Sequence, residues 1–298
     1  MKRLLPLFLS LLLLLPGCSS SAGQDDEAVL HIVATTYPVY LFTNTIVGDT
    51  EGVEVTQLIT EETSCLHDYT LTVTDMKAIE KADVLILSGA GLEDFMEDAL
   101  AQSNAVVIDC SAGIDLLPSS GHEHHDHEDD HDHFDPHFWM DEKAALTMMN
   151  NIVSGLSALD EAHADSYTAN LNHAAGLLSN DSLDASSLSC PYLITFHDGF
   201  QYFARSSGLT LLKAIEEEEG SEASAAEIKE IVALIEEYDI PAIFTEKNGS
   251  DATAQAIARE TGVAVYQLDM IMSGNGQDIS AYVDAMNANY AVIREALS

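Results

Sequence analysis

The chain has 298 residues, of which 47% are hydrophobic, so it is long and apolar enough to bury a core of roughly two domains. It carries 50 acidic against 11 basic side chains, a formal net charge of −39. Such an acidic surface repels nucleic acid and anionic lipid headgroups, which excludes nucleic acid as a partner, and it attracts cations. Acidic surfaces also serve solubility, so the charge supports cation capture without establishing it.

Residues 1–18 have the pattern of a lipoprotein signal peptide. A basic start is followed by the apolar stretch Leu4–Leu15, which is too short to span a bilayer as a helix, and by Leu-Pro-Gly-Cys, a lipobox ending at Cys18. Cleavage there would leave a lipidated Cys18 on the outer face of a bacterial cytoplasmic membrane. The alternative is an ordinary secretory signal in which the cysteine is incidental. Residues 19–27 are small, polar and acidic, as in a flexible tether.

Residues 28–158 alternate between strand-like and helix-like patterns, which predicts a first α/β lobe built on a mainly parallel sheet. Short apolar runs such as Val-Leu-Ile-Leu are typical of strands buried on both faces. The predicted strands cover 28–35, 53–59, 83–87 and 105–108, and the predicted helices cover 39–47, 74–81 and 92–102.

Residues 189–298 repeat this alternation and predict a second α/β lobe of the same kind. Between the two lobes, residues 159–188 carry a long helical pattern, which predicts one rigid helix joining them. The predicted strands of the second lobe cover 192–196, 242–245 and 263–268, and its predicted helices cover 200–206, 225–238, 252–261 and 280–297.

The segment 121–134 is rich in histidine and carboxylate and nearly free of apolar residues, so we expect a surface loop. A solvated acidic loop would explain its carboxylates but not its histidines. Imidazole and carboxylate groups at this density bind borderline divalent ions such as zinc. The histidines within it are His122, His124, His125, His127, His131 and His133.

Three other histidines are candidate ligands of one ordered metal site. His67 and His197 each follow a predicted strand, and ligands of parallel α/β sheets bind beyond the carboxyl ends of the strands. His137 follows the histidine-rich loop, where Pro136 stiffens the chain. Each of these histidines alone could be a core or capping residue. Together they predict an ion held between the two lobes.

Three imidazoles fit a tetrahedral Zn²⁺ with one position left to fill, whereas Mg²⁺ and Ca²⁺ prefer oxygen ligands. Glu246, at the end of a predicted strand, is the first candidate for the fourth ligand. Asp269, after another strand, and a water molecule are the alternatives. Glu246 could instead accept a hydrogen bond from His197 and orient it.

The remaining cysteines are Cys65, Cys110 and Cys190. If Cys18 carries lipid, an odd number of thiols remains and at least one is free. A disulfide between Cys65 and Cys110 is possible, because both follow predicted strands of the first lobe. No Cys-x-x-Cys pair is present, which excludes a zinc ribbon.

The sequence resembles the solute-binding lipoproteins of zinc and manganese ABC importers over nearly all of the mature chain. The resemblance is carried by residues 66–95, by Asp-Pro-His-Phe-Trp-Met-Asp at 135–141 and by Thr-Phe-His-Asp-Gly-Phe at 195–200. It implies two lobes with the metal in the cleft between them, and the histidine-rich loop is similar to that of the zinc members. Met272 stands near the place where manganese members carry an acidic ligand, and Leu66 stands where some zinc members carry glutamate.

The resemblance implies a monomeric receptor that delivers Zn²⁺ to an ABC permease and its ATPase. One alternative is a zinc hydrolase, since an open three-histidine site activates water, but the chain has no His-Glu-x-x-His motif. The other alternative is a surface adhesin that stores zinc.

Overall fold

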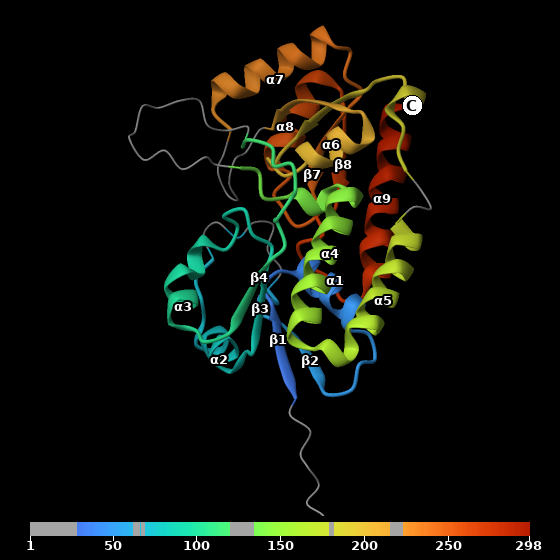
Figure 1. Cartoon of the computed structure of the whole chain (residues 1–298). Coiled ribbons are helices and arrows are strands. Elements are labelled where there is room, and N and C mark those ends of the chain that lie inside the picture. Colours follow the sequence, from blue (N-terminus) through green and yellow to red (C-terminus); the bar gives the residue numbers. More distant parts are fainter. Residues whose placement is uncertain (1–28, 62–65, 67–68, 120–133, 179–181, 215–222) are drawn as a thin grey trace, which may run out of the picture.

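The computed structural model describes residues 29–61, 66, 69–119, 134–178, 182–214 and 223–298. They form two α/β lobes, each a parallel sheet flanked by helices, which confirms the predicted fold class (Figure 1). His67, the six histidines of the 121–134 segment, Cys18 and Cys65 lie outside the described residues. In the described part of the chain, no helix combines the length and the apolar character needed to cross a bilayer.

The first sheet has the strand order β2-β1-β3-β4, with every pair parallel. Its third strand is buried along its whole length, as its continuous apolar sequence predicts. The strands are β1 (Leu30–Ala34), β2 (Val53–Gln57), β3 (Val84–Leu87) and β4 (Val106–Asp109), and the helices are α1 (Tyr37–Val47), α2 (Val73–Lys81) and α3 (Glu97–Gln102).

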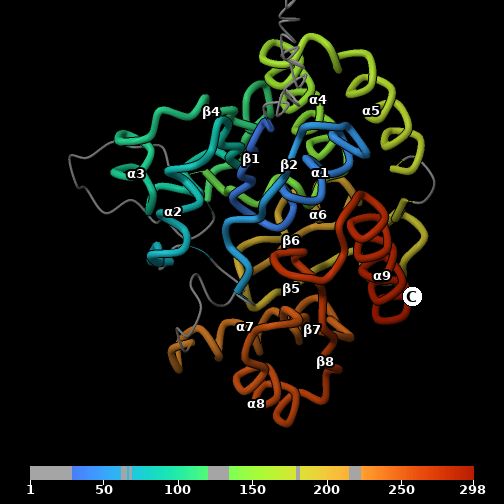
Figure 2. The backbone as a smooth tube through the Cα atoms, turned by 90° about the horizontal axis from the view of Figure 1, so that it is seen from below, coloured from blue at the N-terminus to red at the C-terminus, as the bar shows by residue number. Residues whose placement is uncertain are grey.

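The second sheet has the equivalent order β6-β5-β7-β8, again with all pairs parallel. In each sheet the first and third strands of the lobe are neighbours, which makes the gap beyond their carboxyl ends the topological switch point where ligands bind. Figure 2 shows the two sheets in separate regions of the molecule. The strands are β5 (Tyr192–Thr195), β6 (Thr210–Ala214), β7 (Ala242–Glu246) and β8 (Ala264–Leu268), and the helices are α6 (Gln201–Ser207), α7 (Ala225–Glu237) and α8 (Ala252–Thr261).

Side-chain caps fix where several helices begin. Thr72 accepts a hydrogen bond from the backbone N–H of Asp75, whose carboxylate accepts the Thr72 N–H in return, and the pair starts α2. Ser224 and Glu227 start α7 in the same way. Both boundaries are therefore encoded locally, in a Ser/Thr-x-x-Asp/Glu pattern.

The prediction of one uninterrupted helix over 159–188 is wrong in its extent. The chain forms α4 (Glu142–Leu159), a short 3₁₀ turn at Glu161–His163, α5 (Ala164–Leu178) and a second 3₁₀ turn at Ala185–Ser187. Asp160 separates α4 from α5, because its backbone is not helical, with φ −131° and ψ 73°. Its carboxylate accepts hydrogen bonds from the His163 ring and from the Tyr167 hydroxyl at the start of α5. The Ser-Asn-Asp-Ser sequence after Leu178 is rich in turn-forming residues, which the helical pattern ignored.

A long helix does join the lobes, and it is α9 (Ile279–Leu297). Its first backbone N–H donates to Thr45 of α1 in the first lobe, at 2.7 Å. Further along, Tyr290 stacks on Phe203 of α6 in the second lobe, with ring centroids 5.7 Å apart. Figure 1 shows α9 running alongside α5 toward the second sheet. The lobes are therefore held by continuous packing along this helix.

The short 3₁₀ segment Phe138–Met140 is fully buried at the junction of the lobes. The indole N–H of Trp139 donates to the backbone oxygen of Met270, at 2.9 Å. The hydroxyl of Tyr282, in α9, donates to the backbone oxygen of Trp139, at 2.6 Å. These bonds connect the residues just after His137 to the second lobe and to α9.

The cysteines that the structure describes are free and buried. Burial raises the pKa of the Cys110 thiol well above its ordinary value, and nearby Glu93 and Asp109 add to the effect. Cys110 is therefore an unreactive core residue at neutral pH.

Glu93 is buried beyond the carboxyl ends of β1 and β3 in the first lobe. Its carboxylate accepts hydrogen bonds from the Thr35 hydroxyl at 2.6 Å and from the backbone N–H groups of Ser88 and Gly89 at 2.7 and 2.9 Å. Burial raises its pKa to about 7; these hydrogen bonds partly offset that rise and Asp109 reinforces it. Because the folded protein holds this proton more tightly than the unfolded chain, the stabilisation is complete at low pH and is lost as the pH rises through about 7.

We expect the Glu93→Gln variant to lack this pH dependence. The free energy of unfolding of the wild-type protein, relative to that of the variant, should fall by about 3 kcal/mol between about pH 4.5 and pH 8. Urea unfolding of the metal-free proteins measures this difference. Glu97→Gln, an exposed site in α3, is the matched control for removing one negative charge. A wild-type-to-variant difference that stays constant with pH would show that the Glu93 proton is not bound more tightly on folding.

Candidate metal centre

Two predicted site residues meet at the switch point of the second sheet. His197 follows β5 and Glu246 ends β7, and these neighbouring strands pair at Thr195 and Phe244. The Thr195 hydroxyl donates to the backbone oxygen of His197, at 2.9 Å, which fixes the turn after the strand. Both site side chains are buried, with Nδ1 of His197 3.7 Å from Oε2 of Glu246.

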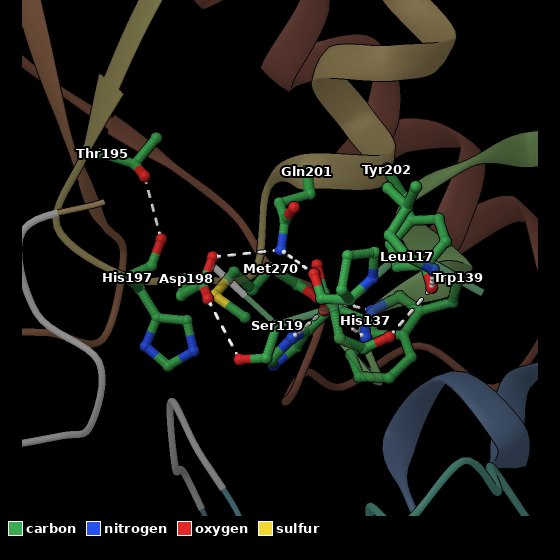
Figure 3. Close-up of polar contacts among 12 residues, drawn as sticks. Leu117, Ser119, His137, Trp139, Thr195, His197, Asp198, Gln201, Tyr202 and Met270 are labelled. Atoms are coloured by element: carbon green, nitrogen blue, oxygen red, sulfur yellow. Dashed lines mark hydrogen bonds and ion pairs between the residues drawn. The ribbon is translucent and has the colours of Figure 1, made fainter. Parts of the chain in front are cut away.

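His137 reaches the same place from the first lobe. Its ring is buried and lies 5.3 Å from the ring of His197, measured between centroids, with the ring planes nearly perpendicular (Figure 3). The predicted convergence of imidazoles from both lobes is therefore present for this pair.

Asp135 fixes the orientation of the His137 ring. Its Oδ1 lies 2.8 Å from Nδ1 of His137 and accepts the backbone N–H of the same residue, at 2.9 Å. In a neutral imidazole, a carboxylate acceptor at Nδ1 favours the tautomer with the proton on Nδ1 and the lone pair on Nε2. A carboxylate–histidine pair of this kind is the usual support of a metal-binding imidazole.

Nε2 of His137 is buried and makes no hydrogen bond to any residue that the structure describes. Buried polar atoms in native proteins are almost always satisfied, so an orphan of this kind needs an explanation. A lone pair aimed into a space beside a second imidazole is a donor for a cation. The donor set, nitrogen from neutral imidazoles, suits Zn²⁺ and other borderline ions.

The two carboxylate candidates for the fourth position differ in their surroundings. Oε2 of Glu246 lies 3.7 Å from Nδ1 of His197. The carboxylate of Asp269 is engaged elsewhere, because Oδ1 accepts the backbone N–H of Ile271 at 2.7 Å and Oδ2 pairs with the Lys247 ammonium at 3.2 Å. Glu246 thus lies within the group of site residues, while Asp269 is held in its own turn.

Tyr202 is a supporting residue that the sequence did not point to. Its hydroxyl accepts the backbone N–H of Leu117 at 2.8 Å and donates to the backbone oxygen of Asp135 at 3.0 Å. Burial raises the pKa of Tyr202 to about 12, so the hydroxyl stays protonated and able to donate. Because Tyr202 lies in α6, shortly after His197, it ties the segment that carries His137 to the segment that carries His197.

The segments flanking the histidine-rich stretch are paired with each other. Pro118 and Phe134 form an isolated antiparallel bridge, and the Asp135 N–H donates to the backbone oxygen of Leu117 at 2.8 Å. The chain therefore leaves and re-enters the described fold at one point, close to His137.

The structure thus brings together His137, His197 and Glu246 from the predicted set. Within the described ranges, no three His, Cys, Asp or Glu side chains form a group that could hold a metal ion by themselves. Asp135 was missed, although it stands in the same short motif as His137, two residues before it. A carboxylate so close in sequence to a candidate ligand was the signal that could have identified it.

The family model described as "Zinc-uptake complex component A periplasmic" matches residues 32–296 of the chain. The high-affinity zinc uptake system protein ZnuA of Bacillus subtilis is 30% identical over 297 residues, which cover 94% of this chain and 92% of that protein. The zinc-binding lipoprotein AdcA of Streptococcus pneumoniae is also 30% identical, over 99% of this chain, but the match spans only 61% of AdcA.

Solved structures of similar proteins hold different metals. FpvC of Pseudomonas aeruginosa, in complex with Mn²⁺, has a TM-score of 0.75 and 28% identity and covers 90% of this chain and 98% of that one. The Zn(II)-bound ZnuA-like domain of Streptococcus pneumoniae AdcA has a TM-score of 0.73 and 26% identity, with 91% and 99% covered. The laminin-binding protein Lmb of Streptococcus agalactiae, described as a bifunctional adhesin and metal transporter, has a TM-score of 0.74 and 27% identity, with 90% and 100% covered.

Replacing Asp135 by alanine should release the His137 ring without removing a ligand atom. We expect zinc affinity to fall by about 10- to 100-fold, the usual effect of losing such a support. Competitive zinc titration measures the affinity, and ¹⁵N spectra of the metal-free protein report which ring nitrogen of His137 carries the proton. An unchanged proton distribution would contradict the orienting role of Asp135.

Proposed function

We propose, from the premise that this chain belongs to the zinc-uptake complex component A periplasmic family, that it captures Zn²⁺ outside the cytoplasm and delivers it to an ABC-type importer. Membership of that family makes it a solute-binding receptor and not an enzyme, which sets aside the hydrolase alternative. Zinc is the cargo of such a receptor.

The observation that carries the proposal is Nε2 of His137, which has no hydrogen-bond partner among the described residues and is buried beside His197 from the other lobe. We infer that both histidines ligate the ion and that His67 supplies the third imidazole. Neutral imidazoles favour zinc over Mg²⁺ and Ca²⁺, which prefer oxygen ligands. An ion bound by residues of both lobes would also hold the lobes together at this point.

Glu246 then serves best as the residue that orients His197, since its carboxylate faces Nδ1 of that ring. This arrangement leaves the fourth ligand position to water. A carboxylate then lies on the Nδ1 side of both histidines, at 2.8 Å for His137 and at 3.7 Å for His197.

Capture and delivery follow from the rest of the chain. The net charge of −39 attracts cations, and the histidines of the 121–134 segment raise the local concentration of zinc. Lipid on Cys18 keeps the monomeric receptor at the membrane, where the loaded form docks on the permease and its ATPase. The structural likeness to laminin-binding Lmb makes adhesion a second candidate function.

Replacing His197 by alanine should lower zinc affinity roughly 100-fold or more. The variant loses a ligand, and the loss of a residue that only supports a ligand already lowers metal affinity about 10- to 100-fold. Competitive titration with a chromophoric chelator measures the effect. His163→Ala is the matched control, since that imidazole binds Asp160 away from the site. A titration of the His197 variant that matches the wild-type protein would refute the ligand role.

Deleting residues 122–133 should leave one tight zinc site and remove the weaker ones, because these histidines serve to collect zinc and not to form the ordered site. Calorimetric titration of the full and shortened chains counts the ions bound in each class. If the tight site disappears with the deletion, the tight site is formed by the loop and not by His137 and His197.

A further inference from the structure

Gly199 lies where the two imidazoles and one thioether meet. A methyl group on its Cα would lie 3.0 Å from Cδ2 of His197 and 3.2 Å from Cδ2 of His137, and closer still to the terminal methyl of Met270. These three side chains come from three separate segments of the chain. Figure 3 shows the Met270 side chain among the residues drawn with the two histidines.

The Met270 methyl group and the Cδ2 atoms of both rings all lie within 3.2 Å of one point, the position of a methyl group on Gly199. In an imidazole, Cδ2 is bonded to Nε2, so this point, with the Met270 methyl group next to it, lies on the side of each ring that carries Nε2. Met270 is buried, with 4% of its surface exposed. An ion between the two Nε2 atoms would therefore have an apolar thioether on one side.

The backbone around Met270 is held from several directions. Its carbonyl oxygen accepts the indole N–H of Trp139. The next residue, Ile271, has a φ of +61°, a left-handed conformation that is rare for a β-branched side chain. The Asp269 carboxylate accepts the Ile271 N–H and the Asn289 side chain bonds both backbone groups of Asp269. Strain of this kind persists only where the surroundings fix it, so the backbone on both sides of Met270 is firmly held.

We propose that Met270 is a specificity-determining residue that forms an apolar wall of the metal site and excludes hard, oxygen-seeking ions such as Mn²⁺. This inference rests on the proposed function, because it concerns the same site. Hard cations need several oxygen ligands, whereas zinc in proteins is usually bound by four ligands in a tetrahedral arrangement. A thioether at this place offers no charged oxygen and keeps the coordination number low. Since proteins of this fold hold manganese as well as zinc, side chains and not the fold must set the choice.

The test compares Zn²⁺ and Mn²⁺ dissociation constants for the full mature chain and its Met270→Glu and Met270→Leu variants. Met270→Glu introduces an oxygen donor at the wall, and we expect the ratio of zinc to manganese affinity to fall at least about tenfold. Met270→Leu keeps the apolar volume without the sulfur and should change that ratio much less. Co²⁺ spectra give an independent readout, since Met270→Glu should convert the intense tetrahedral absorption to the weak absorption of higher coordination.

Two outcomes would overturn the proposal. An unchanged affinity ratio in Met270→Glu, with an unchanged Co²⁺ spectrum, would show that the wall does not select the ion. A loss of zinc affinity in Met270→Leu as large as that in His197→Ala would show that the sulfur is a ligand and not a wall. If instead the wild-type protein shows no tight zinc site that depends on His197, the proposed function itself fails.

A second pair of variants tests the packing even if Met270→Glu does not fold. Gly199→Ala should weaken zinc binding, because its methyl group would push against both imidazoles and Met270. Combining it with Met270→Ala should recover part of that loss, since the double variant frees the space that the new methyl needs. Equal losses with and without Met270→Ala would contradict the three-way contact.

Discussion

The hydrogen bond between Asp135 and the Nδ1 of His137 is the interaction on which the site depends. It fixes the ring so that Nε2 is the free donor, and the surrounding core keeps that atom away from water. Burying a polar atom without a partner costs free energy, so such an arrangement is retained where a ligand supplies the missing partner. Because His137 lies against His197 of the other lobe, this atom is a candidate ligand for a cation at the junction between the lobes.

Packing at the junction holds this geometry. The segment after His137 is fully buried, and its Trp139 and its neighbours bond to the second lobe and to α9. Tyr202 ties the carbonyl group of Asp135 to the helix that follows His197. The two imidazoles are thus set by core packing and by a few buried hydrogen bonds, so their separation does not depend on the acidic surface. That surface acts at longer range, on the approach of the ion.

Much of the fold followed from the sequence, because short apolar runs between helical patterns allow few alternatives to a parallel α/β sheet. Seven of the eight strands and most helices begin or end within a few residues of their predicted limits, including α8 over 252–261. The helix α4 and the edge strand β6 were not predicted. The residues of β6, Thr-Leu-Leu-Lys-Ala, are exposed or half-buried and do not alternate, so they give a weak signal. The predicted helix after Asp160 was extended through Ser-Asn-Asp-Ser, whose residue types favour turns.

The sequence by itself determined the kind of donor, the strand ends that carry it and the family to which the chain is similar, since residue types and their spacing are properties of the chain. Only the tertiary structure decided which ring atom of His137 lacks a partner among the described residues, that Glu246 faces Nδ1 of His197 and that Asp269 is bound in its own turn. It also gathered the Met270 methyl group and both rings around Gly199. Such choices depend on side-chain direction beyond the ends of strands, where spacing along the chain carries no information because each residue leaves the regular pattern of the sheet.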